Sequence, residues 1–83
     1  MNSSSTVLAE IILQDAIDFI GNSPTQFGAD RHAIDTIINN EDFRKTVIDE
    51  ITSCPDDYSE LSNSQEDAAN FVWRAYKKWA YGG

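Results

Sequence analysis

The stretch from Ser64 to Tyr81, SQEDAANFVWRAYKKWAY, decides the fold class of this sequence. It opens on Ser64 with an acid three places later, at Asp67, an arrangement that resembles the capping box at the start of many helices. Acids stand near its beginning and Lys and Arg near its end, which complements the helix dipole. Its apolar residues recur at helical spacing. The stretch therefore predicts a helix that ends before the glycine pair 82–83.

Three further helices are expected upstream, because the apolar residues of three segments fall on one face at about 100° per residue. The segments run from about 6 to 20, from 29 or 30 to 38, and from 41 to 52, and glycine, asparagine and proline separate them. We expect a loop at 23–28 and a polar connection at 56–63 with a short turn near Tyr58. The expected buried residues are Leu8, Ile12, Ala16, Phe19 and Ile20; Ile34, Ile37 and Ile38; and Phe43, Val47, Ile48 and Ile51.

The pattern predicts an all-α fold, with four short helices in one compact domain of bundle-like or orthogonal packing. A chain of 83 residues has the length of a single domain. We expect a disordered tail at residues 1–5, a helical domain at 6–81 and a flexible tail at 82–83. No stretch alternates apolar and polar residues for long enough to indicate a strand.

Fourteen acids against six bases give a formal charge of −8. This sign opposes direct binding to nucleic acid, whose phosphates attract basic surfaces, and docking on anionic lipid. It suits a basic protein as partner. The start of the chain has no basic region typical of a signal peptide, and no apolar run reaches the ~18 residues of a membrane span. We therefore expect a soluble, cytoplasmic protein.

The chain has one histidine, His32, and one cysteine, Cys54, and nothing in the sequence brings the two together. Zinc sites need more such ligands. The acids Asp56, Asp57 and Glu60 lack the alternating ligands and central glycine of a calcium loop. No glycine-rich phosphate loop is present. We expect no catalytic residues, no metal and no cofactor.

Charge is unevenly placed, since residues 1–30 and 46–67 contain no base. Most acids therefore lack the opposite charge at i,i+4 that stabilises many helices. Glu10 and Asp18 lie on one helix stripe, ~12 Å apart along the axis. A solvated face that only maintains solubility is one explanation, and a surface for a basic partner is the other. The predicted partner-binding acids are Glu10, Asp15, Asp18, Asp49, Glu50, Asp56, Asp57 and Glu60.

Five aromatic residues occur between positions 71 and 81. The apolar arc of this helix spans about 200°, which is wider than the face that one core contact needs. Aromatic bulk in the core of a small domain is one explanation. The alternative is that Trp73 or Tyr81 anchors a partner or a second copy, because Trp and Tyr are common binding hot spots.

These observations favour a non-enzymatic interaction protein. The specific hypothesis is an acidic inhibitor, a nucleic-acid mimic that occludes a basic nucleic-acid-handling protein, as phage anti-defence proteins of the anti-CRISPR or anti-restriction type do. One alternative is an immunity protein or antitoxin that neutralises a basic nuclease toxin. Another is a housekeeping helical adaptor or homo-oligomer, whose partner would be a second copy in a homodimer through the last helix. None of these hypotheses involves membrane binding or direct contact with nucleic acid.

Overall fold

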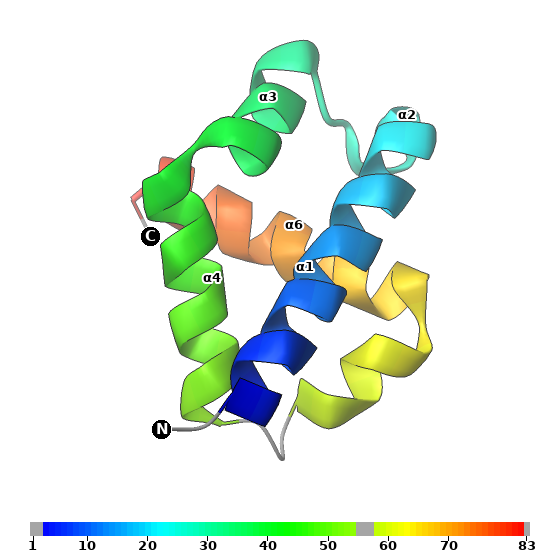
Figure 1. The fold of residues 1–83 in the computed structure, drawn as a ribbon. Coiled ribbons are helices and arrows are strands. Elements are labelled where there is room, and N and C mark those ends of the chain that lie inside the picture. The colour runs from blue at the N-terminus through cyan, green and yellow to red at the C-terminus, as the bar shows by residue number, and fades with distance from the viewer. Residues whose placement is uncertain (1–2, 55–57, 83) are drawn as a thin grey trace.

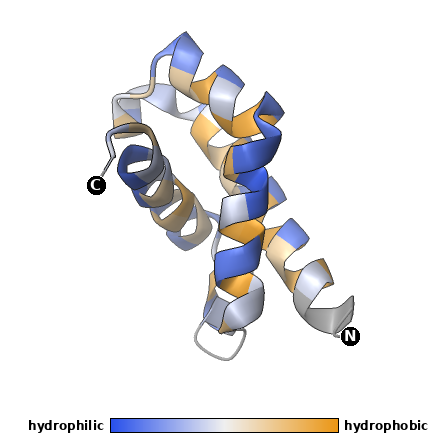
Figure 2. Cartoon of the chain, turned by 90° about the vertical axis from the view of Figure 1, so that its left-hand side faces the viewer, coloured by the Kyte–Doolittle hydropathy of each residue, from blue (hydrophilic) through white to orange (hydrophobic). Residues whose placement is uncertain are grey.

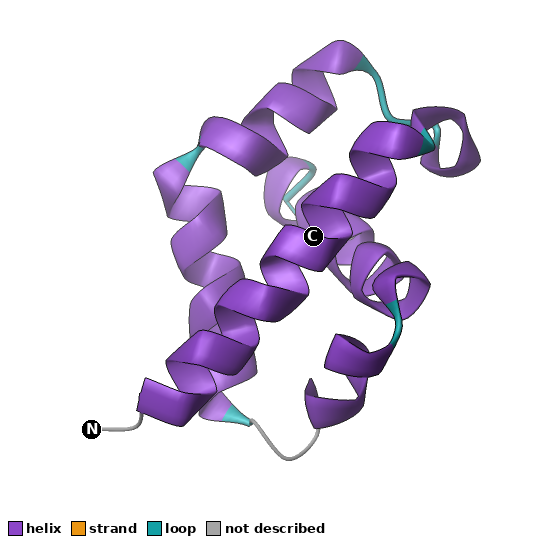
Figure 3. Ribbon diagram, turned by 45° about the vertical axis from the view of Figure 1, so that its right-hand side comes forward, coloured by secondary structure: helices purple, strands orange, loops and turns teal. Residues whose placement is uncertain are grey.

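The computed structural model describes residues 3–54 and 58–82, and the surroundings of the side chains from residue 6 onward. Short loops join helices, and no strand occurs in the part of the chain that the structure describes (Figure 3). The predicted all-α fold is confirmed. The elements are α1 (Ser3–Asn22), α2 (Pro24–Phe27), α3 (Arg31–Asn39), α4 (Glu41–Ser53), the 3-10 helix η1 (Ser59–Asn63) and α6 (Gln65–Ala80).

Helix α1 is the centre of the fold, and it packs most extensively on α6 and then on α4. Helix α4 lies on one side of α1, whereas α2 and η1 lie on the other side (Figure 1). Helix α6 crosses behind α1 rather than running along it, as Figures 1 and 3 both show. The packing is therefore crossed, in the orthogonal rather than the parallel-bundle manner.

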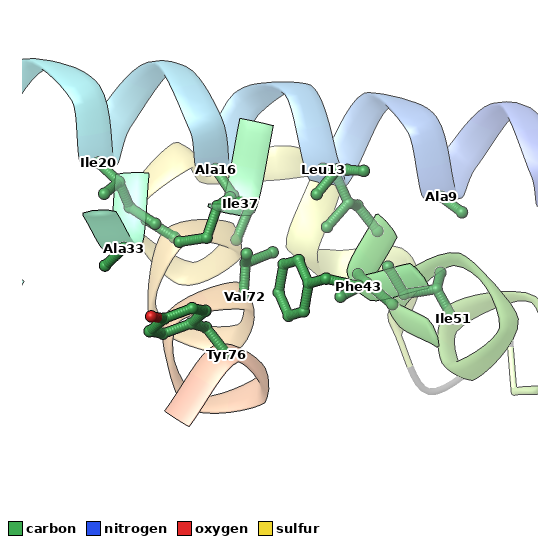
Figure 4. Packing of buried hydrophobic residues seen from close by; sticks show 14 residues of the cluster. Ala9, Leu13, Ala16, Ile20, Ala33, Ile37, Phe43, Ile51, Val72 and Tyr76 are labelled. Carbon is green, nitrogen blue, oxygen red and sulfur yellow. The ribbon is translucent and has the colours of Figure 1, made fainter. Parts of the chain in front are cut away.

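The core lies where α1, α4 and α6 meet. Ala9, Leu13, Ala16 and Ile20 point from α1 into the cluster, towards Phe43 of α4 and Val72 and Tyr76 of α6 (Figure 4). Hydrophobic and hydrophilic residues alternate along the helices of Figure 2, as one buried face per helix requires. The fully buried large side chains are Phe43, Ile12, Leu13, Ile20, Ile37, Ile51, Val47 and Val72.

Side-chain caps fix the starts of three helices. The N–H of Ala33 donates to Asp30 Oδ1 (2.8 Å), and the N–H of Phe43 donates to Asn40 Oδ1 (3.0 Å). At α6, the N–H of Asp67 donates to Ser64 Oγ (3.3 Å), which confirms Ser64 as the cap. The N–H of Ser64 donates to the Leu61 carbonyl (3.4 Å) rather than to the Asp67 carboxylate, so only half of the expected capping box forms.

Helix boundaries differ from the expected ones at two places. Helix α1 begins at Ser3 instead of residue 6, because the serines before it suit a first helical turn. The expected loop at 23–28 contains α2, with Pro24 in the first turn and Gly28 as the left-handed C-cap at φ 68°. Proline near the start and glycine just after the end are a helix signature, and the loop prediction was wrong here.

One burial prediction was also wrong. Ile38 is 40% exposed, because α3 turns Ala33 and Ile37 inward and places Ile38 about 100° away from Ile37. Among the aromatic residues of α6, Trp79 is 38% exposed. It stands in the last turn of α6, where its ring packs edge-on against Phe43 at 5.6 Å between centroids.

None of the helices within residues 3–54 and 58–82 combines the length and the apolar character that a membrane crossing requires.

Candidate functional site

The outward face of α1 carries three of the predicted acids. Glu10 and Asp18 are exposed, and Asp15 is half-buried on the opposite edge of this face, about 140° around the helix from Glu10. Gln14 Nε2 donates to Asp18 Oδ1 at 3.0 Å. Val7 and Ile11, which are 53% and 46% exposed, lie on the same outward stripe as Asp18. The face is therefore apolar at its centre and acidic around it.

The acids remain free of cations throughout residues 3–54 and 58–82, where no carboxylate oxygen comes within 4.0 Å of a Lys, Arg or His nitrogen. The hydrogen bonds that the candidate acids accept come from neutral groups, as at Asp18. The separation of charge in the sequence thus persists in the fold, because none of the six bases comes within ion-pair distance of a described acid.

The two predicted acids of α4 do not join the α1 face. Glu50 Oε1 accepts a hydrogen bond from the Tyr58 hydroxyl at 3.4 Å. Glu50 also lines a groove with Arg74 and Lys78 of α6, so cations lie near it beyond ion-pair distance. Asp49 is exposed, and Lys45 stands one turn before it on the same helix.

Bases are absent from several elements of the fold. Helices α1 and α2, η1 and the first half of α6, up to Trp73, contain no base. Helix α1 contacts the other three, and α2 and η1 lie on the side away from α4 (Figure 1). The exposed acids of these elements are Glu10, Asp18, Glu60, Glu66 and Asp67.

The sequence analysis missed Glu66 and Asp67 as candidates, because their position in the first turn of α6 already explains them as partners of the helix dipole. Their place beside η1 follows from tertiary packing and could not be seen in the sequence. The predicted Asp56 and Asp57 lie outside the described residues.

The aromatic residues of α6 differ in how far they are buried and in how many other rings they contact. Trp73 is half-buried, with Tyr76 stacked on it at 5.3 Å and 20°, and Phe27 of α2 tilted against it at 6.2 Å. Phe43 meets Tyr76 edge-on at 5.9 Å. Tyr81, the C-cap of α6, is 76% exposed and touches Tyr76 by its edge at 6.3 Å. Tyr81 is thus the most available aromatic, and Trp73 is largely committed to the fold.

A groove runs along the outward face of α6 between α2 and η1, and we call it the α6 groove. Its side chains come from three segments of the chain that tertiary packing brings together. At one end, Gln26 Nε2 donates to Glu66 Oε2 at 3.1 Å and joins α2 to α6. The spacing of Asp67, Asn70, Arg74 and Lys77, at i, i+3, i+7 and i+10, was the only indication of it in the sequence. The groove is lined by Gln26, Phe27, Leu61, Asp67, Asn70, Trp73, Arg74 and Lys77.

Tyr76 has a resolved shift in acidity. Burial raises the pKa of the Tyr76 hydroxyl above its ordinary value, and the negative charges that Tyr81 and Asp30 can carry raise it further.

Reactive and metal-binding residues are dispersed. Within the described ranges, no three His, Cys, Asp or Glu side chains come together to hold a metal ion. Cys54 follows the end of α4 and is exposed, whereas His32 is at the start of α3. These two helix ends lie at opposite ends of the molecule (Figure 1).

No family model matches the chain, and neither a curated protein nor a solved structure is significantly similar to it.

Proposed function

We propose that this chain is a non-enzymatic inhibitor that binds a basic, nucleic-acid-handling protein and presents carboxylates where nucleic acid would present phosphates. The observation that carries the proposal is the outward face of α1, whose exposed acids Glu10 and Asp18 have no cation within 4.0 Å among the described residues. Such carboxylates contribute little to the fold. Their electrostatic interactions become most favourable when another molecule supplies the positive charge.

The geometry of α1 supports this proposal. Glu10 and Asp18 are separated by ~12 Å along the helix axis, which is about the rise of three to four nucleotides along one DNA strand. Both side chains are exposed on a helix without a base. A partner whose basic groove follows a phosphate backbone would therefore meet charges of the right sign at a comparable spacing.

The exposed apolar side chains of Val7 and Ile11 add a second kind of contact. An apolar centre with a charged rim is the usual construction of a protein interface. Charge complementarity at the rim would make association fast and sensitive to salt. The partner surface is accordingly expected to be apolar at its centre and rich in Lys and Arg around it.

The test compares two double charge reversals of equal size. Glu10→Lys with Asp18→Lys changes the outward face of α1, and Asp35→Lys with Asp49→Lys changes exposed acids of α3 and α4. Proteins captured from cells that encode the chain are eluted with salt and identified. The captured protein is then assayed for binding to labelled DNA with each variant present as competitor.

We expect the wild-type chain and the Asp35/Asp49 variant to compete with DNA, and the Glu10/Asp18 variant to compete at least about tenfold less well, as loss of close charge pairs implies. Equal competition by both variants would refute the assignment of the surface. Capture of a nuclease toxin that the chain neutralises would favour the immunity-protein alternative instead.

A further inference from the structure

The α6 groove concentrates groups that the proposed inhibitory surface does not use. In a chain with only six bases, two of them, Arg74 and Lys77, line this one groove. Neither has a carboxylate within 4.0 Å among the residues that the structure describes. The groove thus offers two unneutralised cations on a molecule of net charge −8, and an anionic group of a ligand would be held there by charge-assisted hydrogen bonds.

Aromatic rings form part of the same groove. Tyr76 is stacked on one side of the Trp73 indole, and the Phe27 ring is tilted against it by 57°. The indole is nevertheless half-buried rather than buried, and it lines the groove beside the two cations. A planar ring of a ligand can therefore contact the part of the indole that these rings leave uncovered, and contact with aromatic side chains is a general source of affinity for nucleobases.

The charges of the groove are sorted along the helix. Asp67 stands seven residues before Arg74, which separates them by about 10 Å along the axis. Asn70 lies between them, with an exposed side-chain amide that can donate and accept. A simple anion would be repelled by Asp67, whereas a ligand with a donor at one end and an anion at the other matches both ends.

We propose that the α6 groove binds a free nucleotide whose base carries an amino group, with AMP as the representative. The base contacts the Trp73 indole, and its amino group donates to the Asp67 carboxylate. The phosphate lies at Arg74 and Lys77. The hydrogen bond from Gln26 to Glu66 holds α2 against α6 and so fixes the acidic end of the groove. This site is independent of the inhibitory surface on α1.

The experiment follows Trp73 fluorescence in a Trp79→Phe background, where Trp73 is the remaining tryptophan. AMP, UMP, adenosine and inorganic phosphate are titrated separately. We expect a saturable change with AMP, and apparent affinities at least about fivefold lower for adenosine and for phosphate, because each lacks one of the two groups that the groove holds. UMP should bind more weakly than AMP, because uracil offers the Asp67 carboxylate one ring N–H between two carbonyls instead of an amino group.

Two neighbouring lysines provide the matched control. Lys77 lines the α6 groove, whereas Lys78 lines a neighbouring groove beside Glu50, and Arg74 lies between the two grooves. Lys77→Gln should weaken AMP binding roughly fivefold, while Lys78→Gln, with the same change in net charge, should leave it within about twofold. Asp67→Asn should remove the preference for AMP over UMP.

Three results would overturn the proposal. The first is the absence of a saturable response to AMP. The second is an equal loss of AMP affinity from Lys77→Gln and Lys78→Gln, which would indicate nonspecific electrostatic attraction. The third is tighter binding of a deoxyadenosine oligomer, per nucleotide, than of AMP, which would indicate single-stranded nucleic acid as the ligand. Each leaves the competition assay for the α1 surface unaffected.

Discussion

Helices α1 and α6 pack on each other more extensively than any other pair, yet their sequences solve the packing differently. Helix α6 sorts acids to its first turn and lysines to its last, is capped by Ser64, and fills its buried face partly with the ring of Tyr76. Helix α1 has no acid in its first turn and no base in its last. It buries alanine and aliphatic residues inward and leaves Val7 and Ile11 half-exposed outward.

The difference shows where to look for function. Nearly every residue on the inward face and at the ends of α6 has a role in stability, so only its outward stripe needs another explanation. On α1 the acids and the exposed aliphatic residues add little to the fold. Features that folding does not require are the better candidates for contact with another molecule.

The strongest test of this contrast is Phe43→Ala. Phe43 of α4 is fully buried, and its ring contacts those of Tyr76 and Trp79. If the α6 aromatics serve the core, the cavity should lower the free energy of unfolding by about 3–5 kcal/mol. Urea denaturation followed by circular dichroism measures this, and a loss below about 1 kcal/mol would show that the core does not depend on these rings.

The cap of α6 provides the next largest effect. Ser64→Ala removes the oxygen that accepts from the N–H of Asp67 and should cost about 1 kcal/mol. Ser64→Gly should cost only a few tenths of a kcal/mol, because glycine is tolerated at this position. The same denaturation assay distinguishes the two variants, and equal losses would contradict the role of the hydroxyl as a cap.

The Tyr76 hydroxyl should make the stability of the folded chain depend on pH. Its pKa in the folded chain is raised, chiefly by burial, so its contribution is complete below the unfolded pKa of about 10. Above that pH the unfolded chain loses the proton first, and stability falls as the pH rises through the folded pKa. Thermal melts of wild type and Tyr76→Phe between neutral and alkaline pH should show a smaller decline for the variant. Identical declines would contradict this account.

The smallest expected change is on the outward face of α1. Val7→Thr keeps the shape and the helix propensity of a residue that is 53% exposed, so stability should change by no more than about 0.5 kcal/mol. The same kind of change at the buried Ile12, Ile12→Thr, should cost several times more because it buries a hydroxyl. If Val7→Thr proved equally costly, Val7 would belong to the fold and not to a binding surface.

The fold class could be predicted because periodicity and caps are local properties of the sequence. The helices at 41–52 and 64–81 were predicted to within a residue or two, since Asn40 and Ser64 mark their starts. Helix α2 was missed because Pro24 and Gly28 were taken as loop residues, although together they begin and end one helical turn. The exposure of Ile38 depends on how α3 is rotated against α1, and a single helix does not reveal that.

The candidate sites could be predicted from the sequence only in part. The lack of bases in two segments was visible in the chain, and it correctly indicated acids without cationic partners. It did not indicate that Glu50 would line a groove with Arg74 and Lys78. The α6 groove was missed because Phe27 and Leu61 reach Trp73 only through packing between distant segments.

Asn40 connects α3 to α4 alone, since it is both the last cap of one helix and the first cap of the next. Its N–H donates to the Thr36 carbonyl, and its side chain accepts from Phe43. One added or deleted residue at this junction would rotate α4 by about 100° relative to α3 and swing Phe43 away from the interior. Natural variants of this chain should therefore tolerate changes of residue type here far better than changes of length.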